Sequence, residues 1–553
     1  MIREIIPGKT KESRMSNIQS DDRHNRQMII IFACIIAAVF VFYPHYNVHA
    51  ENVETSLQLI QKKLDFIWII VAASMVFFMQ VGFTAYEAGS VQAKNAISVS
   101  IKNILNFLIS SIAYFIVGFG IMFGVSYNGY IGISNFLLYG IDTHLTSLGY
   151  AFVFIQLVFA GTAATITSGA YAERAKLLTH ICTTIIVVCL IYPVFGHWAW
   201  GHLLHTHQYG WLERLGFIDF AGSTVVHSVS GWIALSGAIV LGPRTGKFNP
   251  DGTVNRMYGH NLPLATIGTF FLWFGWFGFN GGALLQADTS IGLVIINTTL
   301  SGSVAGVAAA VFRKLKTKTL DAAEILLGIM GGIVAIGAGC SRVSPIYACI
   351  VGLCAGIIAL LAKDFIEKVL RVDDPVGAVP VHGFCGAWGT LAVGLFTPVS
   401  AFSMTNFSRL LQVGVQCLGI IVAFAWAFSV GLLFFWCMKK LAGIRISAEE
   451  EVKGLNISEY ADVTSWLDFV KITKVQDLNV ALQDKIKDRT RELEDIKRNL
   501  EEDVKKRTSE LEKSRDDFMK KAEQLENFAK VAVGRELKMK KMEEELYSLK
   551  KLK

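Results

Sequence analysis

The sequence predicts an all-α membrane protein with eleven transmembrane helices, arranged as a 5+5 inverted repeat plus one and followed by a cytoplasmic helical coiled coil. Three observations lead to this prediction. The 553 residues are 52% hydrophobic and 18% charged, with a mean hydropathy of +0.45, whereas soluble domains carry more charge. Apolar stretches long enough to cross a bilayer recur through most of the chain. One histidine-containing motif occurs twice, once in each half of this apolar region.

Residues 1–50 are predicted to be a signal peptide or an N-terminal anchor. A basic, polar stretch precedes the apolar run Met28–Tyr43, and the small-residue sequence Val48-His49-Ala50 offers a cleavage site before Glu51. The apolar run is short compared with the roughly 20 residues that cross a bilayer. We therefore favour a removed signal peptide over an additional membrane helix.

The membrane domain is predicted to extend over residues 62–442. It contains repeated apolar stretches of roughly 20 residues, with glycine and alanine scattered through them as in packed transmembrane helices. The eleven predicted spans are 65–88, 103–125, 148–171, 178–203, 222–242, 262–284, 289–312, 321–340, 344–362, 377–397 and 410–438.

Basic residues in the loops predict the orientation of these spans. If the first span begins outside, the cytoplasmic loops carry seventeen Lys and Arg residues and the external loops carry three, Arg214, Arg342 and Arg409. Cytoplasmic loops are enriched in Lys and Arg, so we expect a multi-pass protein of the cell (inner) membrane. Its N-terminus is expected outside after signal removal and its C-terminus in the cytoplasm. The formal charge of +7 follows from this topology and requires no nucleic acid partner.

After Gly443 charged residues dominate, and a cytoplasmic tail is predicted. Residues 443–474 form its juxtamembrane regulatory segment, and residues 475–553 form a coiled-coil helix of the signalling type. Apolar residues from Leu500 to Leu549 fall on one seam of three- and four-residue spacing, which is interrupted at Arg507, Ser514, Lys521 and Arg535. This seam favours a helix that pairs with copies of itself. Related sequences occur at 486–493 and 504–511. A solvated single helix is the alternative.

The motif that occurs twice has the form D-x-x-G-x-x-x-V-H-x-x-x-G. Its copies are Asp219–Gly231, at the start of the fifth span, and Asp374–Gly386, at the start of the tenth. These two spans enter the bilayer from opposite sides, so spans one to five and six to ten are predicted to form an inverted repeat. Each histidine lies eight residues beyond its aspartate, which corresponds to roughly 12 Å along a helix.

His227 and His382 are therefore expected near the middle of the membrane, facing each other across the repeat interface. An ionisable residue at this depth needs a partner or a function. Two neutral imidazoles can bond to each other and still offer polar edges to a small passing molecule. The alternative is two separately buried histidines bonded to backbone. No carboxylate lies in mid-span to neutralise a cation. The site is therefore a poor one for a metal ion and a better one for a polar molecule that can lose its charge.

Aromatic residues cluster where such a molecule would enter. Trp198 and Trp200 close the fourth span, and the sixth contains Phe274, Trp276, Phe277 and Phe279. Aromatic faces attract cations, although belts of aromatic residues also mark ordinary membrane interfaces.

An enzyme is the weakest of the functional classes, and neither a cofactor nor a metal is predicted. The nine cysteines lie singly, without a C-x-x-C pair, which argues against a disulfide framework or a zinc module. His202, His205 and His207 have metal-like spacing, but such spacing occurs by chance in an exposed loop. Glu87 and Glu173 have no evident acid–base partner in the sequence.

Several motifs together resemble the ammonium transporter (Amt/Mep) family, over residues 62–462. They are the two histidine motifs, Ala172-Glu173-Arg174, His260-Asn261-Leu262-Pro263, Gly275–Asn280 and Asp373-Asp374-Pro375. The resemblance implies a homotrimer with one conduction path in each subunit. It also implies the roles of individual residues: Trp200, Phe159 and Phe279 in an outer recruitment site and phenyl gate, Asp219 in its electrostatic support, and His227 and His382 as paired pore histidines.

One position departs from the family. Ala283 stands where the recruitment site usually has a serine, four residues after Phe279. A hydrogen bond to a charged group contributes roughly 1.5–3 kcal/mol. We therefore expect altered recruitment of ammonium.

The resemblance implies that ammonium is captured outside, loses its proton near the gate and crosses as ammonia. The first hypothesis is ammonium transport, coupled to or regulated by the coiled coil. The second is an ammonium receptor that conducts poorly and signals through the coiled coil to a cytoplasmic partner. The family also suggests a PII-type regulator at the cytoplasmic face.

Overall fold

The computed structural model describes residues 50–141, 147–204, 208–402 and 408–460, with scattered positions from 482 to 548. The chain divides into two compact units, Met1–Ala461 and Asp462–Lys553. The predicted signal peptide or anchor lies outside the described residues except for Ala50, and so does most of the predicted coiled coil. The described positions of the second unit are helical, and the pairing of this segment with other copies stays a prediction.

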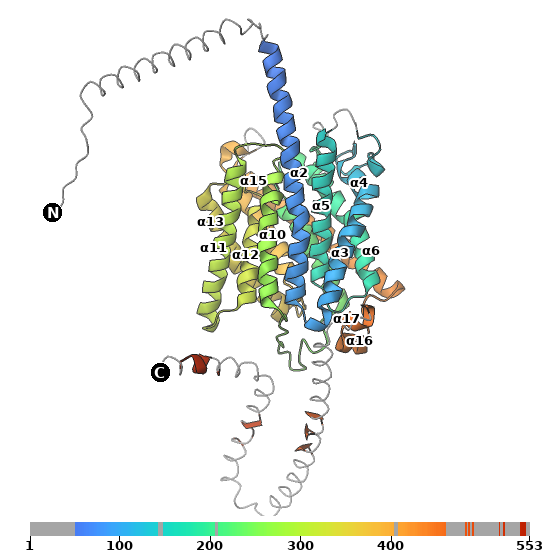
Figure 1. Ribbon diagram of the computed structural model, residues 1–553, viewed down its shortest axis with the longest axis vertical. Helices are drawn as coiled ribbons and strands as arrows, with labels where there is room; N and C mark the ends of the chain where they lie inside the picture. The colour runs from blue at the N-terminus through green and yellow to red at the C-terminus, as the bar shows by residue number, and fades with distance from the viewer. Residues whose placement is uncertain are drawn as a thin grey trace, which may run out of the picture. The chain divides into compact units, whose positions relative to one another are not determined.

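The described part of the first unit is a bundle of eleven helical passages (Figure 1). They are α2 (Ala50–Ser90), α3 with η2 and α4 (Ala96–Ala113, Tyr114–Gly118, Phe119–Phe123), α5 (Ser147–Gly169), α6 with η4 and α7 (Leu177–Ile186, Val187–Ile191, Tyr192–Trp200), η5 with α9 (Ser223–Ser228, Val229–Leu241), α10 (Leu262–Gly282), α11 (Ile291–Thr317), α12 (Ala322–Ile336), α13 with η6 (Pro345–Asp364, Phe365–Val369), η7 with α14 (Val379–Phe384, Cys385–Phe396) and α15 (Arg409–Leu441).

Short elements connect these passages or follow them. They are η1 (Ala93–Asn95), the antiparallel strands β1 (Ser126–Tyr127) and β2 (Ile131–Gly132), η3 (Phe136–Leu138), α8 (Trp211–Arg214), η8 (Val399–Ala401), and two tail helices, α16 (Ala448–Lys453) and α17 (Leu455–Tyr460).

Each of the eleven predicted spans coincides with one helical passage. Among the described residues, ten passages are long and apolar enough to cross a membrane, and α12 is shorter, with 15 residues. Polar side chains cap the first turns of several helices. Asn261, Asp321 and Ser408 accept backbone N–H bonds at the starts of α10, α12 and α15. The prediction of an all-α membrane protein is confirmed.

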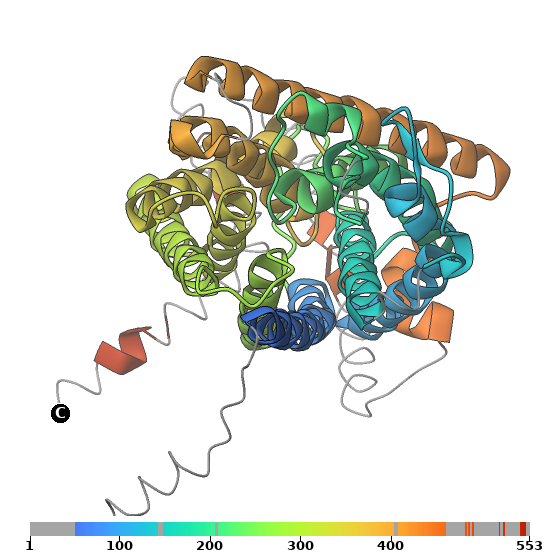
Figure 2. The ribbon, with the colours of Figure 1, turned by 90° about the horizontal axis from the view of Figure 1, so that it is seen from above.

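Small residues let the long helices α2 and α10 approach closely. A Cβ added to Gly268 of α10 would lie 2.3 Å from the backbone nitrogen of Tyr86, and one added to Gly278 would lie 2.4 Å from the oxygen of Ala72. Such close backbone contact is typical of packed membrane helices. α15 packs on α9 and α14, and it is the long helix along one side of the bundle in Figure 2.

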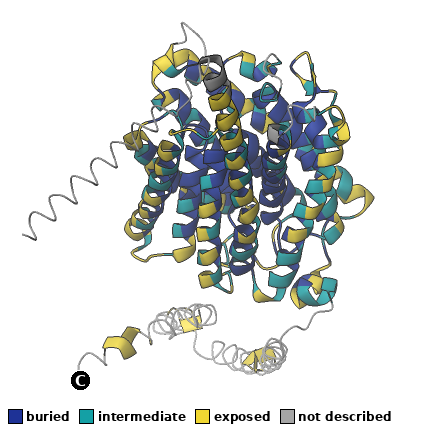
Figure 3. Ribbon diagram, turned by 45° about the horizontal axis from the view of Figure 1, so that its top comes forward, coloured by how far each residue is buried: buried dark blue, intermediate teal, exposed yellow. Residues whose placement is uncertain are grey.

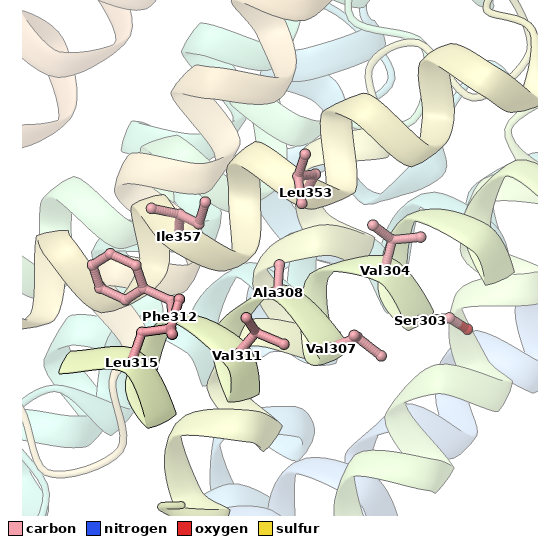
Figure 4. A pocket seen from close by; sticks show the side chains of 9 residues that line it. All are labelled: Ser303, Val304, Val307, Ala308, Val311, Phe312, Leu315, Leu353 and Ile357. Carbon is pink, nitrogen blue, oxygen red and sulfur yellow. The ribbon is translucent and has the colours of Figure 1, made fainter. Parts of the chain in front are cut away.

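The interior of the bundle is buried and its outer face is exposed (Figure 3), and many of the exposed side chains are large and apolar. Phe270, Val307 and Leu410 are among the large side chains that are more than 60% exposed. A groove of about 420 Å³ runs between α11 and α13, lined by apolar side chains such as Val307, Val311, Leu353 and Ile357 (Figure 4). Faces of this kind suit lipid chains or another apolar protein surface.

Candidate functional site

The first copy of the repeated motif forms a tight turn held by Asp219. Its Oδ1 accepts a hydrogen bond from the Gly222 backbone N–H at 3.0 Å, and its Oδ2 accepts from Thr224 and Val225, both at 2.8 Å. Gly222 has a φ of 101°, a left-handed conformation that glycine adopts without steric strain. The turn opens directly into η5, a π-helical segment that carries His227.

The second copy repeats this geometry. Asp374 Oδ1 accepts from the Gly377 N–H at 3.0 Å, and Oδ2 accepts from the Val379 N–H at 2.8 Å. Gly377 has a φ of 77°, and the turn opens into the π-helical η7 that carries His382. The shared motif is therefore a structural unit, in which an aspartate caps a wide helical turn that presents a histidine. Such π-helical turns are frequent at functional sites.

The two units cross with matching contacts. A Cβ on Gly231, four residues after His227, would lie 2.3 Å from the backbone nitrogen of Gly383, which follows His382. A Cβ on Gly386, four residues after His382, would lie 2.6 Å from the side-chain oxygen of Ser228, which follows His227. This reciprocity is the local signature of an inverted repeat, and it brings the two histidines to its centre.

The histidine rings meet through the same type of nitrogen. Nδ1 of His227 lies 3.1 Å from Nδ1 of His382, the ring centroids are 5.1 Å apart, and the rings are inclined by 24°. The side chains are 1% and 5% exposed. One Nδ1 must carry the proton that the other accepts. In a neutral pair, one ring then has a bare Nε2 and the other has an Nε2–H, so the pair offers one acceptor and one donor.

A column of aromatic rings continues from His227. Phe279 lies 5.2 Å from the His227 ring and stacks on Phe159 at 4.2 Å with an inclination of 27°. Trp200 follows at 6.4 Å from Phe159, and its Nε1–H donates to the backbone oxygen of Asp219 at 2.6 Å. All these side chains are buried. The rings that the sequence analysis singled out are therefore neighbours, in the order Trp200, Phe159, Phe279, His227.

The carboxyl group of Asp219 is bonded within its own turn, and its backbone oxygen contacts the aromatic column at Trp200. The backbone N–H groups described above occupy both carboxyl oxygens, and the backbone oxygen orients Trp200. Burial raises the pKa of Asp219 to about 6, although the backbone N–H donors of its turn act in the opposite direction. Asp219 thus holds the turn through its carboxyl group and positions Trp200 through its backbone oxygen.

Ala283 follows the last residue of α10 and is half-buried among apolar side chains. Its methyl group offers no hydrogen-bond acceptor. The metal-like histidine cluster lies partly outside the described residues, because only His202 is described. That side chain pairs with Glu213 and stacks on Tyr209. In the described ranges no group of three His, Cys, Asp or Glu side chains could hold a metal ion.

An ionic network below the second turn was missed by the sequence analysis. Arg244 bonds both oxygens of Asp373, at 2.7 and 2.8 Å, and also pairs with Glu173. Burial opposes ionisation of Asp373, but the hydrogen bonds and charge of Arg244 hold its pKa well below the ordinary value. Asp373 directly precedes Asp374, so the network borders the turn that carries His382. The one hint in the sequence was the pair of adjacent aspartates.

The tail segment docks beside this network. Glu451 of α16 accepts hydrogen bonds from the N–H and hydroxyl of Thr245, at 2.7 and 3.0 Å, and pairs with Arg445 at 2.8 Å. Glu459 of α17 pairs with Lys102 of α3 at 3.0 Å. α16 and α17 are seen beneath α3 and α6 in Figure 1. The described part of the juxtamembrane segment, up to Tyr460, is thus in the same folded unit as the helices above it.

Comparison with known proteins identifies a family with similar sequences. The sequence model described as "Ammonium Transporter Family" matches residues 67–465. The chain is 40% identical to the ammonium transporter Amt2 of Archaeoglobus fulgidus over 433 residues, which cover 75% of this chain and 90% of that protein. It is 36% identical to ammonium transporter 1 member 3 of Solanum lycopersicum, covering 72% of this chain and 92% of the relative.

Solved structures agree with these relatives. A structure titled "Sensor Amt Protein" has 52% sequence identity and a TM-score of 0.72, covering 73% of this chain and 99% of its own. The crystal structure of Candida albicans Mep2 has 27% identity and a TM-score of 0.64, covering 70% and 87% of the two chains.

Proposed function

The chain belongs to the ammonium transporter family, and we propose that it conducts ammonia derived from ammonium through a hydrophobic pore centred on His227 and His382. Ammonium is captured beside Trp200, loses its proton at the stacked Phe159 and Phe279, and crosses past the histidines uncharged. The single observation that carries this proposal is the Nδ1 to Nδ1 contact of 3.1 Å at the end of the aromatic column.

Charge is the reason for separating ammonia from its proton. Moving a bare cation through a pore lined by phenyl rings costs several kcal/mol or more, and deprotonation removes this term. The aromatic faces still attract the cation before it loses the proton. The histidine pair then receives a small molecule that both donates and accepts hydrogen bonds. His227 Nε2 is buried and has no hydrogen-bond partner in the described structure, so it is free to bond ammonia.

The second part of the proposal concerns the tail. Its helices α16 and α17 contact the loop that carries Arg244 and the start of α3, next to the turn of Asp374. We propose that the coiled coil acts through these contacts, either regulating conduction or reporting it to a cytoplasmic signalling partner or PII-type regulator. Members of the family are transporters rather than enzymes.

Assembly and location complete the proposal. The apolar outer face and the groove between α11 and α13 are consistent with a multi-pass membrane protein. We propose a homotrimer in the cell (inner) membrane, with the N-terminus outside after signal removal and the tail in the cytoplasm.

The alternative function is an ammonium receptor that conducts poorly. Three points support it: the likeness to a structure titled as a sensor, the alanine at position 283, where the family resemblance implies a serine in the recruitment site, and the docked tail. Ammonium-evoked currents on a supported membrane separate the two functions. Transport predicts a current that disappears in His227→Asp, whereas a receptor predicts ammonium binding by calorimetry without current or methylammonium uptake. Loss of both binding and current would exclude both functions.

A further inference from the structure

Glu87 is a buried carboxyl group that forms no ion pair among the described residues. It lies three residues before the end of α2 and is 3% exposed. The other buried carboxylates of the described chain are compensated: Glu173, Glu324, Glu451 and Asp373 take part in ion pairs, and Asp219 accepts several backbone N–H bonds. Glu87 receives one hydrogen bond, from the side-chain amide of Asn103 at 3.1 Å. An isolated anion in such a place is expensive.

The inverted repeat relates Glu87 to Asn280. Tyr86-Glu87-Ala88-Gly89 near the end of α2 corresponds to Phe279-Asn280-Gly281-Gly282 at the end of α10. Asn280 bonds Thr298 of α11 at 2.8 Å, and Glu87 bonds Asn103 of α3, the equivalent helix of the other half. The two halves therefore share this position in the fold but differ in its charge.

The neighbours of the two side chains also correspond. A Cβ on Gly337, at the end of α12, would lie 3.5 Å from Asn280 Oδ1 and 3.2 Å from the hydroxyl of Ser223, four residues after Asp219. A Cβ on Gly169, at the end of α5, would lie 3.2 Å from Glu87 Oε1 and 3.7 Å from the Cβ of Ala378, four residues after Asp374.

Glu87 thus lies against the turn that leads into His382. The hydroxyl of Tyr86 donates to the Val376 oxygen of this turn at 3.0 Å. A neutral amide at the outer position and a carboxyl at the inner one make the two sides of the histidine pair chemically different, although their backbones match.

The Glu87–Asn103 pair can hold either protonation state. The amide N–H donates to a carboxylate, and after a half-turn of the amide its oxygen accepts the proton of a carboxylic acid. Asn103 Oδ1 is buried and has no other partner in the described structure, so this half-turn breaks no other bond of that oxygen. A carboxyl group that exchanges protons requires such an adaptable partner.

We propose that Glu87 is the proton-exchange group on the inner side of the histidine pair, an inference that rests on the proposed function. Ammonia that has passed His382 takes the proton of the Glu87 carboxylic acid. The O–H bond breaks, its electron pair stays on the carboxylate, and the nitrogen lone pair forms the new N–H bond. The ammonium ion leaves toward the cytoplasm, and the carboxylate takes up a proton from water at that side.

Infrared difference spectroscopy of the reconstituted full chain, with and without ammonium chloride, tests this step. The wild type is expected to lose a carboxylic acid C=O band when ammonium is added, Glu87→Gln to lack this change, and Glu87→Asp to recover it at a shifted frequency. Glu324→Gln is the matched control, because it removes a buried carboxyl of α12 that is held in ion pairs, and it should keep the wild-type change. Glu87→Asp keeps the test valid if Glu87→Gln does not fold.

Currents provide the second readout. Glu87→Gln is expected to reduce the ammonium-evoked current at least tenfold and to flatten the dependence of this current on inner pH. The titratable groups that face Glu87 are Asp374, Tyr86 and Tyr171, and this variant retains all three. Equal spectra and equal currents in wild type and Glu87→Gln overturn the role of Glu87 and leave the transport proposal standing. Absence of current in the wild type instead rejects transport, and with it the passage of ammonia on which this role of Glu87 depends.

Discussion

Replacing Glu459 of the tail should weaken docking of α17 by removing the charge partner of a buried lysine. Lys102 and Glu459 are 4% and 14% exposed at the side chain, and their ion-pair distance is 3.0 Å. Breaking a buried ion pair from one side costs about 3–5 kcal/mol. We take the lower end, about 3 kcal/mol, because Glu459 is partly hydrated and Lys102 keeps a hydrogen bond to the oxygen of Ala175. In Glu459→Gln the docking equilibrium should then fall roughly 100-fold.

Limited trypsin digestion measures this equilibrium at Lys453, which is the last residue of α16, just before α17, and is cut when the segment undocks. Glu459→Gln should accelerate cleavage there by about two orders of magnitude, whereas Glu449→Gln, an exposed change on α16, should not. The double-mutant cycle with Lys102→Met isolates the pair. A coupling energy below roughly 0.5 kcal/mol would refute the reasoning, because the two side chains would then act independently.

Three further predictions concern other parts of the molecule. Ala283→Ser should lower the half-saturating ammonium concentration of the current about 10-fold or more, since a hydrogen bond to a cation contributes roughly 1.5–3 kcal/mol; an unchanged value would remove this position from recruitment. Gly231→Ala should abolish folding or conduction, because its Cβ meets backbone at 2.3 Å, while Gly414→Ala, with nothing within 4 Å, should be tolerated in detergent melting curves. Asp373, whose pKa lies below its ordinary value, stabilises the fold above that ordinary value and loses this contribution as pH falls through its folded-state pKa. Asp373→Asn should therefore lower the melting temperature at neutral pH, by removing one of the two carboxylates that pair with Arg244, and reduce the further loss in acid; an unchanged acid dependence would contradict this assignment.

The sequence predicted those features of the fold that depend on local pattern. Apolar length located each span, and the spacing of the repeated motif anticipated that His227 and His382 would lie together. The motif did not reveal that its aspartates cap π-helical turns, because wide turns have no periodic signature of their own. The span expected at 321–340 ends as a helix at Ile336, since the oxygens of Gly337 and Ala338 instead accept hydrogen bonds from the Asp219 turn. Tertiary contacts of this kind are invisible to hydropathy.

Ionic partners were also beyond the reach of the sequence. Glu173 had no evident partner along the chain, yet it pairs with Arg244, which in turn holds Asp373. These residues come from separate loops, and only the packing of the two repeats brings them together. For Glu87 the partner is an amide on the next helix, which composition alone does not distinguish from any other polar residue.

Charged residues beside the repeated motif differ between the two halves, and this difference connects only the Asp374 turn to the described part of the tail. The turn held by Asp219 is preceded by the apolar Ile218, and its Phe220 and Ala221 donate backbone N–H bonds to the oxygens of Ala338 and Gly337. Its inner equivalent is preceded by Asp373, which links through Arg244 to Glu173, and the loop after Arg244 bonds Glu451 of the tail through Thr245. A shift of the inner turn therefore changes charged contacts that end on the tail, whereas the same shift of the outer turn changes backbone contacts inside the membrane domain. The proposed coupling of the tail to ammonium is therefore expected to act through the Asp374 turn that carries His382, rather than through the Asp219 turn.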